Sequence, residues 1–221
     1  MKLEKFAGPV LLAIALLCFV GGSAKAATPF PDPAVDAKGG SEQGKQTAVL
    51  AGGCFWCTAA VFEQLDGVDK VVAGFAGGDA ASANYEIVSA GHTNHAESIE
   101  ITYDPVKISY GTLLKIFFSV AHDPTQLNRQ GPDYGRQYRS AIFYKNDEQK
   151  RIAEAYIKQL SEMQVFKKPI VTEVTPLKGF YPAEDYHQRF CSRHPNDPYV
   201  MANSVPKLDK LKKEDGALLK R

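Results

Sequence analysis

The chain has no marked excess of charge of either sign. Its 26 lysines and arginines nearly balance its 25 aspartates and glutamates, which leaves a formal net charge of +1. Proteins that bind nucleic acids through phosphate contacts usually carry a basic excess, so we expect no nucleic-acid partner. The 221 residues are 44% hydrophobic, which is typical of an ordinary globular domain.

A glycine-rich nucleotide-binding motif is also missing. The pair Gly77-Gly78 falls far short of the G-x-G-x-x-G pattern that holds a dinucleotide. We therefore expect no bound cofactor.

Metal-ligating residues are few. Cys54-x-x-Cys57 and Cys191-x-x-His194 together supply three cysteines and one histidine. The gap between the two pairs is much longer than the ~12–20 residues usual in small zinc modules. We expect no metal site, and a zinc-stabilised binding module is kept as a non-enzymatic alternative.

The chain begins with an apolar run. Residues 6–20 are almost entirely apolar, follow Lys2 and Lys5, and precede the small-residue pattern Ala24-Lys25-Ala26. A bilayer span needs ~20 apolar residues, so the pattern predicts a signal peptide over residues 1–26, cleaved near Ala26. The product would be periplasmic or secreted, with no stable membrane insertion. An uncleaved anchor is the alternative.

Cysteine is scarce. Of four cysteines, Cys18 lies in the predicted signal peptide, which leaves Cys54, Cys57 and Cys191. An odd number in an exported protein indicates at least one free thiol or a pair that exchanges, rather than a static disulfide framework.

Two of these cysteines lie in the run Gly52-Gly53-Cys54-Phe55-Trp56-Cys57, directly after the apolar residues 48–51. A thiolate at a strand-to-helix junction lies near the positive end of the helix, which lowers its pKa, so we expect Cys54 to be a nucleophile. Cys57, one helical turn on, is placed to attack an oxidised Cys54, and Cys191 is a second candidate for that resolving role. A buried core cysteine is the alternative for each.

The rest of the chain alternates between strand-like and helix-like patterns. Residues 27–46 are rich in proline, glycine and charge and predict a flexible leader. The order that follows favours an α/β sandwich with helices packed on a sheet. The predicted strands are residues 48–51, 71–75, 98–103, 138–144 and 170–174, and the predicted helices are residues 54–65, 109–121 and a segment that starts at residue 146. Residues 79–95 are predicted to form a loop, and the charged run at the C-terminus is expected to wrap the surface and fray.

Glu97 precedes one of the predicted strands. At the mouth of an apolar site its pKa would be raised, and it would then serve as a general acid. The alternative is a solvated glutamate at a strand end. Tyr85, Tyr138 and Asp133 are polar groups in or beside loops, and no spacing argument selects them.

Motifs spread from Val49 to Leu208 resemble, in order, those of the A-type methionine sulfoxide reductases, the peptide-methionine (S)-S-oxide reductases. Cys57 lies inside the nucleophile motif, which resembles the GCFWC subtype. The motifs are Gly53-Cys54-Phe55-Trp56 and the segments at residues 74–78, 85–88, 95–97, 122–126, 130–140 and 183–188.

The resemblance implies a catalytic domain over residues 47–208, followed by a charged tail at 209–221. It implies an α+β fold: a two-layer sandwich with a ferredoxin-like core, a mixed sheet and a long irregular C-terminal segment. The implied activity is thiol-dependent reduction of methionine S-sulfoxide, free or within oxidised proteins, which repairs oxidative damage. We expect a monomer.

The resemblance also implies roles for single residues. Cys54 would attack the sulfoxide sulfur and become a sulfenic acid. Glu97 would donate the proton, Tyr85 and Tyr138 would hold the oxygen, and Asp133 would support them.

Phe55 and Trp56 would form the pocket for the substrate methyl group. Cys57 would then form a disulfide with Cys54, which an external thioredoxin-like dithiol would reduce. The nearest alternative is a general thiol–disulfide oxidoreductase, which would use the same Cys-x-x-Cys pair.

Overall fold

The computed structural model describes residues 1, 29–37 and 44–220. The predicted signal peptide and the cleavage site near Ala26 fall almost wholly on residues 2–28, outside the described residues, as do 38–43 and 221. Within the described ranges, no helix is long and apolar enough to cross a bilayer.

A six-stranded mixed sheet forms the centre of the molecule, in the order β7-β6-β1-β3-β2-β8. Every neighbouring pair is antiparallel except β6 and β7, which are parallel. The strands are β1 (Gln46–Gly52), β2 (Val68–Ala76), β3 (Ala96–Tyr103), β6 (Ser140–Tyr144), β7 (Glu173–Pro176) and β8 (Phe180–Pro182). A separate two-stranded ribbon joins β4 (Arg129–Gln130) to β5 (Asp133–Tyr134).

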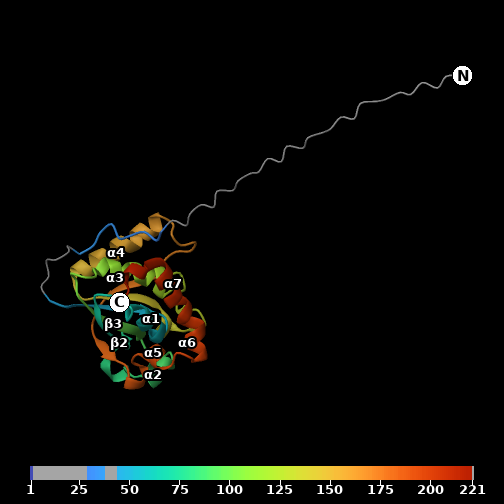
Figure 1. Ribbon diagram of the computed structural model, residues 1–221. Coiled ribbons are helices and arrows are strands. Elements are labelled where there is room, and N and C mark those ends of the chain that lie inside the picture. Colours follow the sequence, from blue (N-terminus) through green and yellow to red (C-terminus); the bar gives the residue numbers. More distant parts are fainter. Residues whose placement is uncertain (2–28, 38–43, 221) are drawn as a thin grey trace.

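The helices pack on this sheet. In Figure 1, α3, α4 and α7 lie beside one another at one end of the molecule, and α2, α5 and α6 lie at the other. The α-helices are α1 (Phe55–Phe62), α2 (Tyr85–Ser89), α3 (Tyr110–Ile116), α4 (Asp147–Glu162), α5 (Phe190–Arg193), α6 (Pro198–Asn203) and α7 (Val205–Asp215). Single turns complete the set: the 3₁₀ turns η1 (Ala80–Ser82), η3 (Arg136–Tyr138), η4 (Asp185–His187) and η5 (Gly216–Leu218), and the π-helical turn η2 (Phe117–Ala121).

The four central strands have the ferredoxin-like order. Along the chain, helix α1 connects β1 to β2, and the α3–η2 region connects β3 to β6. In the sheet, β3 lies between β1 and β2, and β6 lies on the other side of β1. This is the split β-α-β arrangement. The predicted α/β sandwich with a ferredoxin-like core is therefore confirmed.

Period-two alternation along β1 explains how the sheet is covered. Ala48 and Leu50 face the main core with the helices, whereas Val49 and Ala51 belong to a smaller cluster on the opposite face. All four side chains are buried because both faces of this central strand are covered.

Part of the predicted flexible leader is docked, which corrects the prediction for residues 29–37. The Tyr156 hydroxyl donates to the carbonyl of Pro31 at 2.6 Å, and the Asp36 carboxylate accepts from the amide of Gly111 at 2.7 Å. Asp36 thereby satisfies an amide at the start of α3 that has no partner within the helix, and this fixes the segment.

The C-terminal region is more regular than the sequence suggests. Three helices, α5, α6 and α7, occupy residues 190–215, and the expected frayed run of lysines lies largely on α7. Leu211 on α7 is fully buried against the main core, so the helix is held by packing, while Lys210, Lys212 and Lys213 are exposed. Two smaller predictions also differ from the structure. The strand predicted at residues 170–174 lies at Glu173–Pro176, and the loop predicted at residues 79–95 contains helix α2.

Candidate active site

Cys54 occupies the N-cap of α1, at the junction that the sequence predicts. The turn depends on Gly53, whose φ is +86°; a Cβ built there would lie 2.4 Å from the Gln130 side chain. Only glycine fits both conditions. The Gln130 amide is itself held by hydrogen bonds to the backbone N–H and C=O of Asp123. The close approach of Gln130 therefore fixes the turn that presents Cys54.

The protonation of the cysteine pair differs from the expectation. Burial raises the pKa of Cys54 well above its usual range, and this outweighs the effect of the helix start. A hydrogen bond from Cys54 lowers the pKa of Cys57 to about 6. The two sulfurs thus share one proton, held by Cys54, and the negative charge lies on Cys57. Cys54, Cys57 and Cys191 are buried and form no disulfide.

Glu97 lies directly beside the nucleophile. It is the second residue of β3, and its Oε2 accepts a hydrogen bond from the backbone amide of Phe55 at 3.0 Å. The side chain is 3% exposed, and burial raises its pKa to about 8. The expectation of a raised pKa is confirmed, so the carboxyl group holds its proton at neutral pH.

Both tyrosines named from the resemblance surround this carboxyl group. Tyr85 begins α2, and Tyr138 ends the turn η3. Burial raises the pKa of each phenol, and Glu97 and Cys54 raise both further once they are ionised at higher pH. Each hydroxyl therefore stays protonated and can donate a hydrogen bond. Asp133 acts on the same groups, since its charge contributes to the raised pKa of Glu97 and of both tyrosines.

Aromatic rings line the first turn of α1. The Phe55 ring stacks with that of Tyr85 at a centroid distance of 6.4 Å. Trp56 stacks on Phe190 of α5 at 3.7 Å and donates from its Nε1 to Nδ1 of His187 at 3.1 Å. Because Nδ1 accepts, the neutral ring carries its proton on Nε2. These contacts hold both side chains in fixed orientations. The Phe55 ring lies beside Tyr85, and the Trp56 ring lies against Phe190 on α5.

Two residues of this cluster were not singled out from the sequence. His187 lies in the quoted motif at residues 183–188 but had no assigned role, and the structure places its ring 4.3 Å from that of Tyr85. Tyr199 lies on α6; its hydroxyl donates to Asp133 at 2.5 Å, and its proximity lowers the pKa of both cysteines of the pair. No pattern in the sequence signals Tyr199, because only the packing of α6 brings it to α1.

Cys191 lies on α5, apart from Cys54 but close to Cys57. Its Sγ is 3.3 Å from the carbonyl oxygen of Trp56 and 3.2 Å from the hydroxyl of Ser204. That hydroxyl in turn donates to Cys57 Sγ at 3.1 Å. Burial raises the pKa of Cys191 to about 11, so it is a thiol at neutral pH.

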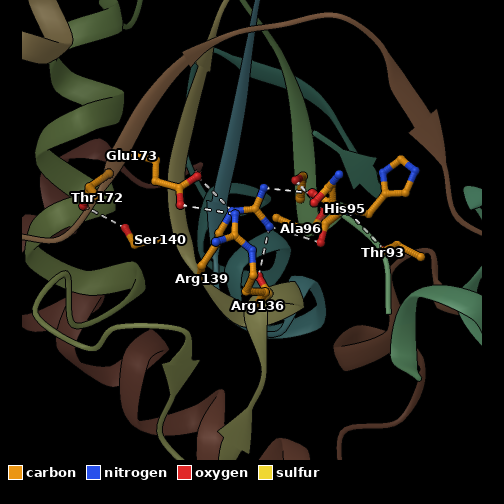
Figure 2. A network of polar contacts seen from close by, with 10 residues as sticks. Thr93, His95, Ala96, Arg136, Arg139, Ser140, Thr172 and Glu173 are labelled. Atoms are coloured by element: carbon orange, nitrogen blue, oxygen red, sulfur yellow. Dashed lines mark hydrogen bonds and ion pairs between the residues drawn. The ribbon is translucent and has the colours of Figure 1, made fainter. Parts of the chain in front are cut away.

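A buried arginine fixes the strand end that carries Glu97. Figure 2 shows the Arg139 guanidinium between the Glu173 carboxylate and the backbone carbonyls that precede β3. It donates to the carbonyls of His95 and Asn94 at 3.2 and 3.0 Å, and to Glu173 at 3.0 Å. Arg139 directly follows Tyr138 in the chain. Its side chain therefore connects the segment that carries Tyr138 to the start of β3, the strand that carries Glu97.

The residues considered for a metal site are not arranged as ligands. His194 is exposed and stacks on Phe190, while Cys191 contacts Ser204. Within the described ranges, no group of three or more histidine, cysteine or acidic side chains could hold a metal ion.

Comparison with known proteins decides the family. Residues 46–218 match the family model described as peptide methionine sulfoxide reductase. The chain is 57% identical over 192 residues to peptide methionine sulfoxide reductase MsrA 2 of Synechocystis sp., covering 86% of this chain and 90% of that protein. It is 48% identical over 176 residues to the MsrA of Thermus thermophilus, covering 80% and 98%. The chain belongs to the peptide methionine sulfoxide reductase family.

Solved structures of MsrA-type reductases share the fold. Methionine sulfoxide reductase A of Corynebacterium diphtheriae matches with a TM-score of 0.61 and 33% identity, over 77% of this chain and 86% of that one. Reduced Mxr1 of Saccharomyces cerevisiae matches with a TM-score of 0.61 and 32% identity, over 69% and 87%. Membership of this family makes the protein an oxidoreductase that reduces methionine sulfoxide.

Proposed function

We propose that this protein reduces the S epimer of methionine sulfoxide, with Cys54 as the nucleophile and Glu97 as the proton donor. The observation that carries the proposal is the joint placement of the two groups. Cys54 caps α1, and the buried, protonated Glu97 contacts the amide of the next residue, Phe55. A protonated carboxyl group beside a buried thiol is what attack on a sulfoxide requires, because the leaving oxygen needs a proton.

The first step transfers oxygen. The proton of Cys54 passes to the Cys57 thiolate, one hydrogen bond away, and the new Cys54 thiolate attacks the sulfoxide sulfur. Glu97 donates its proton to the sulfoxide oxygen, and the tyrosine hydroxyls of Tyr85 and Tyr138 stabilise the charge on it. The oxygen ends on Cys54 as a sulfenic acid, and methionine leaves.

The second step forms the disulfide between Cys54 and Cys57. The ionised Glu97 takes up the proton that Cys57 received in the first step, and Cys57 Sγ attacks the sulfur of the Cys54 sulfenic acid. The S–S bond forms, the S–O bond breaks, and the hydroxyl group leaves as water with the proton from Glu97. This assigns the protein to the GCFWC subtype, in which the resolving cysteine lies within the nucleophile motif. Cys191, one serine hydroxyl away from Cys57, is the alternative resolving residue.

An external dithiol then reduces the disulfide. The electrons come from a thioredoxin-like partner that exchanges both its thiols. We propose further that the apolar N-terminus exports the protein to the periplasm or beyond, where it acts as a monomer on free or protein-bound sulfoxide. The charge pattern of residues 1–26 supports export.

The substrate pocket accounts for stereochemistry. Phe55 and Trp56 supply apolar surface for the methyl group of the sulfoxide, while Tyr85 and Tyr138 supply donors for its oxygen. Asp133 holds Tyr199 at the same site. A site with one apolar wall and one donor wall accepts one arrangement of methyl and oxygen around a chiral sulfur.

The test is reduction of a peptide that carries both epimers of methionine sulfoxide. Dithiothreitol supplies the electrons, and chromatography follows each epimer. The proposal predicts loss of the S epimer while the R epimer persists. If neither epimer is lost and insulin disulfides are reduced instead, the protein is a general thiol–disulfide oxidoreductase, and the roles given to Glu97 and the tyrosines are wrong.

A further inference from the structure

We propose that Ser204 is a positioning residue for the resolving step, and that its hydroxyl holds Cys57 Sγ in place as a thiolate while Cys191 forms the far end of the same hydrogen-bond chain. The inference rests on the proposed function, in which Cys57 attacks the oxidised Cys54. It assigns a task to a buried serine and a buried cysteine that the first step does not use.

Ser204 lies at the junction of α6 and α7 and is 1% exposed. Its Oγ is 3.1 Å from Cys57 Sγ and 3.2 Å from Cys191 Sγ. Helix α1, which lies far from the C-terminal helices in the chain, thus meets them at one hydroxyl: α1 brings Cys57, α5 brings Cys191, and the α6–α7 junction brings Ser204.

The direction of the hydrogen bonds follows from the number of protons. A serine hydroxyl carries one proton and accepts with its lone pairs. Cys191 is a thiol, because burial raises its pKa, so it donates to Ser204 Oγ or to the carbonyl of Trp56. Ser204 is then free to donate its own proton to Cys57, the sulfur that carries the charge.

Other groups also face Cys57. Tyr199 on α6 and Lys207 on α7 favour its thiolate, as does the hydrogen bond from Cys54. Cys191 lies on the far side of Ser204, and Glu97 on β3 is an electrostatic neighbour of Cys57. In the first step Cys57 accepts the thiol proton of Cys54, and the ionised Glu97 then takes up that proton, so Cys57 carries its charge again once Cys54 is a sulfenic acid. Ser204 is then the buried hydroxyl already in hydrogen-bond contact with Cys57 at the moment of attack.

The side chain of Ser204 has no structural task in α7. It makes no cap hydrogen bond to the helix; the amides of Lys207 and Leu208 instead bond its backbone carbonyl at 3.1 Å each. Removal of the hydroxyl should therefore leave the fold intact. A loss of rate should appear in the second step and not in the first.

The test compares Ser204→Ala with the wild type in a single turnover without external reductant. Reduced protein is mixed with an equal amount of a peptide containing methionine S-sulfoxide and quenched with a thiol-alkylating reagent at a series of pH values. Chromatography gives the rate of methionine formation, and mass spectrometry gives the rate of Cys54–Cys57 disulfide formation. Ser192→Ala is the matched control, since that exposed serine on α5 bonds only the carbonyl of Arg189 in the described structure.

We expect Ser204→Ala to form methionine at least as fast as the wild type, because a more basic Cys57 accepts the Cys54 proton no less readily. This rate also shows that the variant is folded. The pH midpoint of disulfide formation should move up by about one unit, with a rate about tenfold lower below the midpoint. Ser204→Thr, which keeps a hydroxyl, should return the midpoint toward the wild type.

An unchanged midpoint in Ser204→Ala would overturn the inference, as would an equal loss of the methionine-forming step. If the wild type itself forms no methionine, the proposed function fails, and this outcome is distinct from a failure of the Ser204 role alone.

Discussion

The carboxyl oxygen Oε2 of Glu97 lies 3.0 Å from the backbone nitrogen of Phe55, the residue that follows Cys54. The proton donor and the nucleophile are therefore built on the same helix start. The amide that Glu97 contacts is one of those that a helix leaves without an internal partner. This contact keeps the acid in place, while burial keeps it protonated.

Glu97→Gln should slow methionine formation by ~10²–10⁴-fold, the usual range for loss of a general acid. The amide oxygen of glutamine can still accept from Phe55, so the fold should persist. Single-turnover methionine formation measures the effect. Glu100→Gln is the control, because that residue lies on the same strand but pairs with Lys145. Equal rates in Glu97→Gln and the wild type would remove Glu97 from the mechanism.

The methionine-forming step should weaken as the pH rises through about 8, where Glu97 loses its proton. Stability should follow the same group. The folded protein keeps a proton that the unfolded chain releases near 4.5, so the free energy of unfolding falls as pH rises from about 4.5 to about 8. Urea unfolding across this window should show a smaller fall for Glu97→Gln. An identical slope in both proteins would contradict the assignment.

Cys57→Ser should form one methionine per protein and then stop, because the sulfenic acid at Cys54 has lost its resolving partner. Cys191→Ser should continue to cycle with a dithiol protein as reductant. Steady-state turnover of the two variants separates the candidates. Full multiple turnover by Cys57→Ser, abolished when Cys191→Ser is added, would show that Cys191 resolves instead.

Gly53→Ala should destabilise the protein by roughly 1–3 kcal/mol, since alanine at φ +86° is strained and its Cβ would overlap the Gln130 side chain. Activity should fall with it, because the same turn presents Cys54. Gly216→Ala is the control: its φ is −56°, and a Cβ there meets no atom within 4 Å. Thermal unfolding of both variants tests the contrast, and equal stability would refute the account of this turn.

The central strands and the nucleophile turn could be predicted from local signals. Alternation marks β3, and the glycine pair before Cys54 marks the turn into α1. These features are set by residues close together in the sequence. The raised pKa of Glu97 was also predictable, because it follows from an acid at the mouth of an apolar site.

Other features depend on packing between distant segments. Tyr199 and Ser204 reach α1 only because α6 and α7 dock there, and buried Leu211 is a single apolar position within a charged run. The pKa of Cys54 was predicted in the wrong direction because the helix start was considered without burial or the neighbouring thiol. The docking of residues 29–37 similarly depends on a contact between distant segments, the hydrogen bond from the Gly111 amide of α3 to Asp36.

The most direct test of the account uses the double variant Cys57→Ser, Cys191→Ser, which leaves Cys54 as the only cysteine in residues 27–221. The variant is mixed with an equal amount of a peptide containing one epimer of methionine sulfoxide, and the intact protein mass and the peptide are both measured. The account predicts that the S epimer yields methionine and adds one oxygen atom to Cys54, while the R epimer does neither. Methionine formed without oxygen on Cys54, or oxygen transfer from both epimers alike, would contradict it.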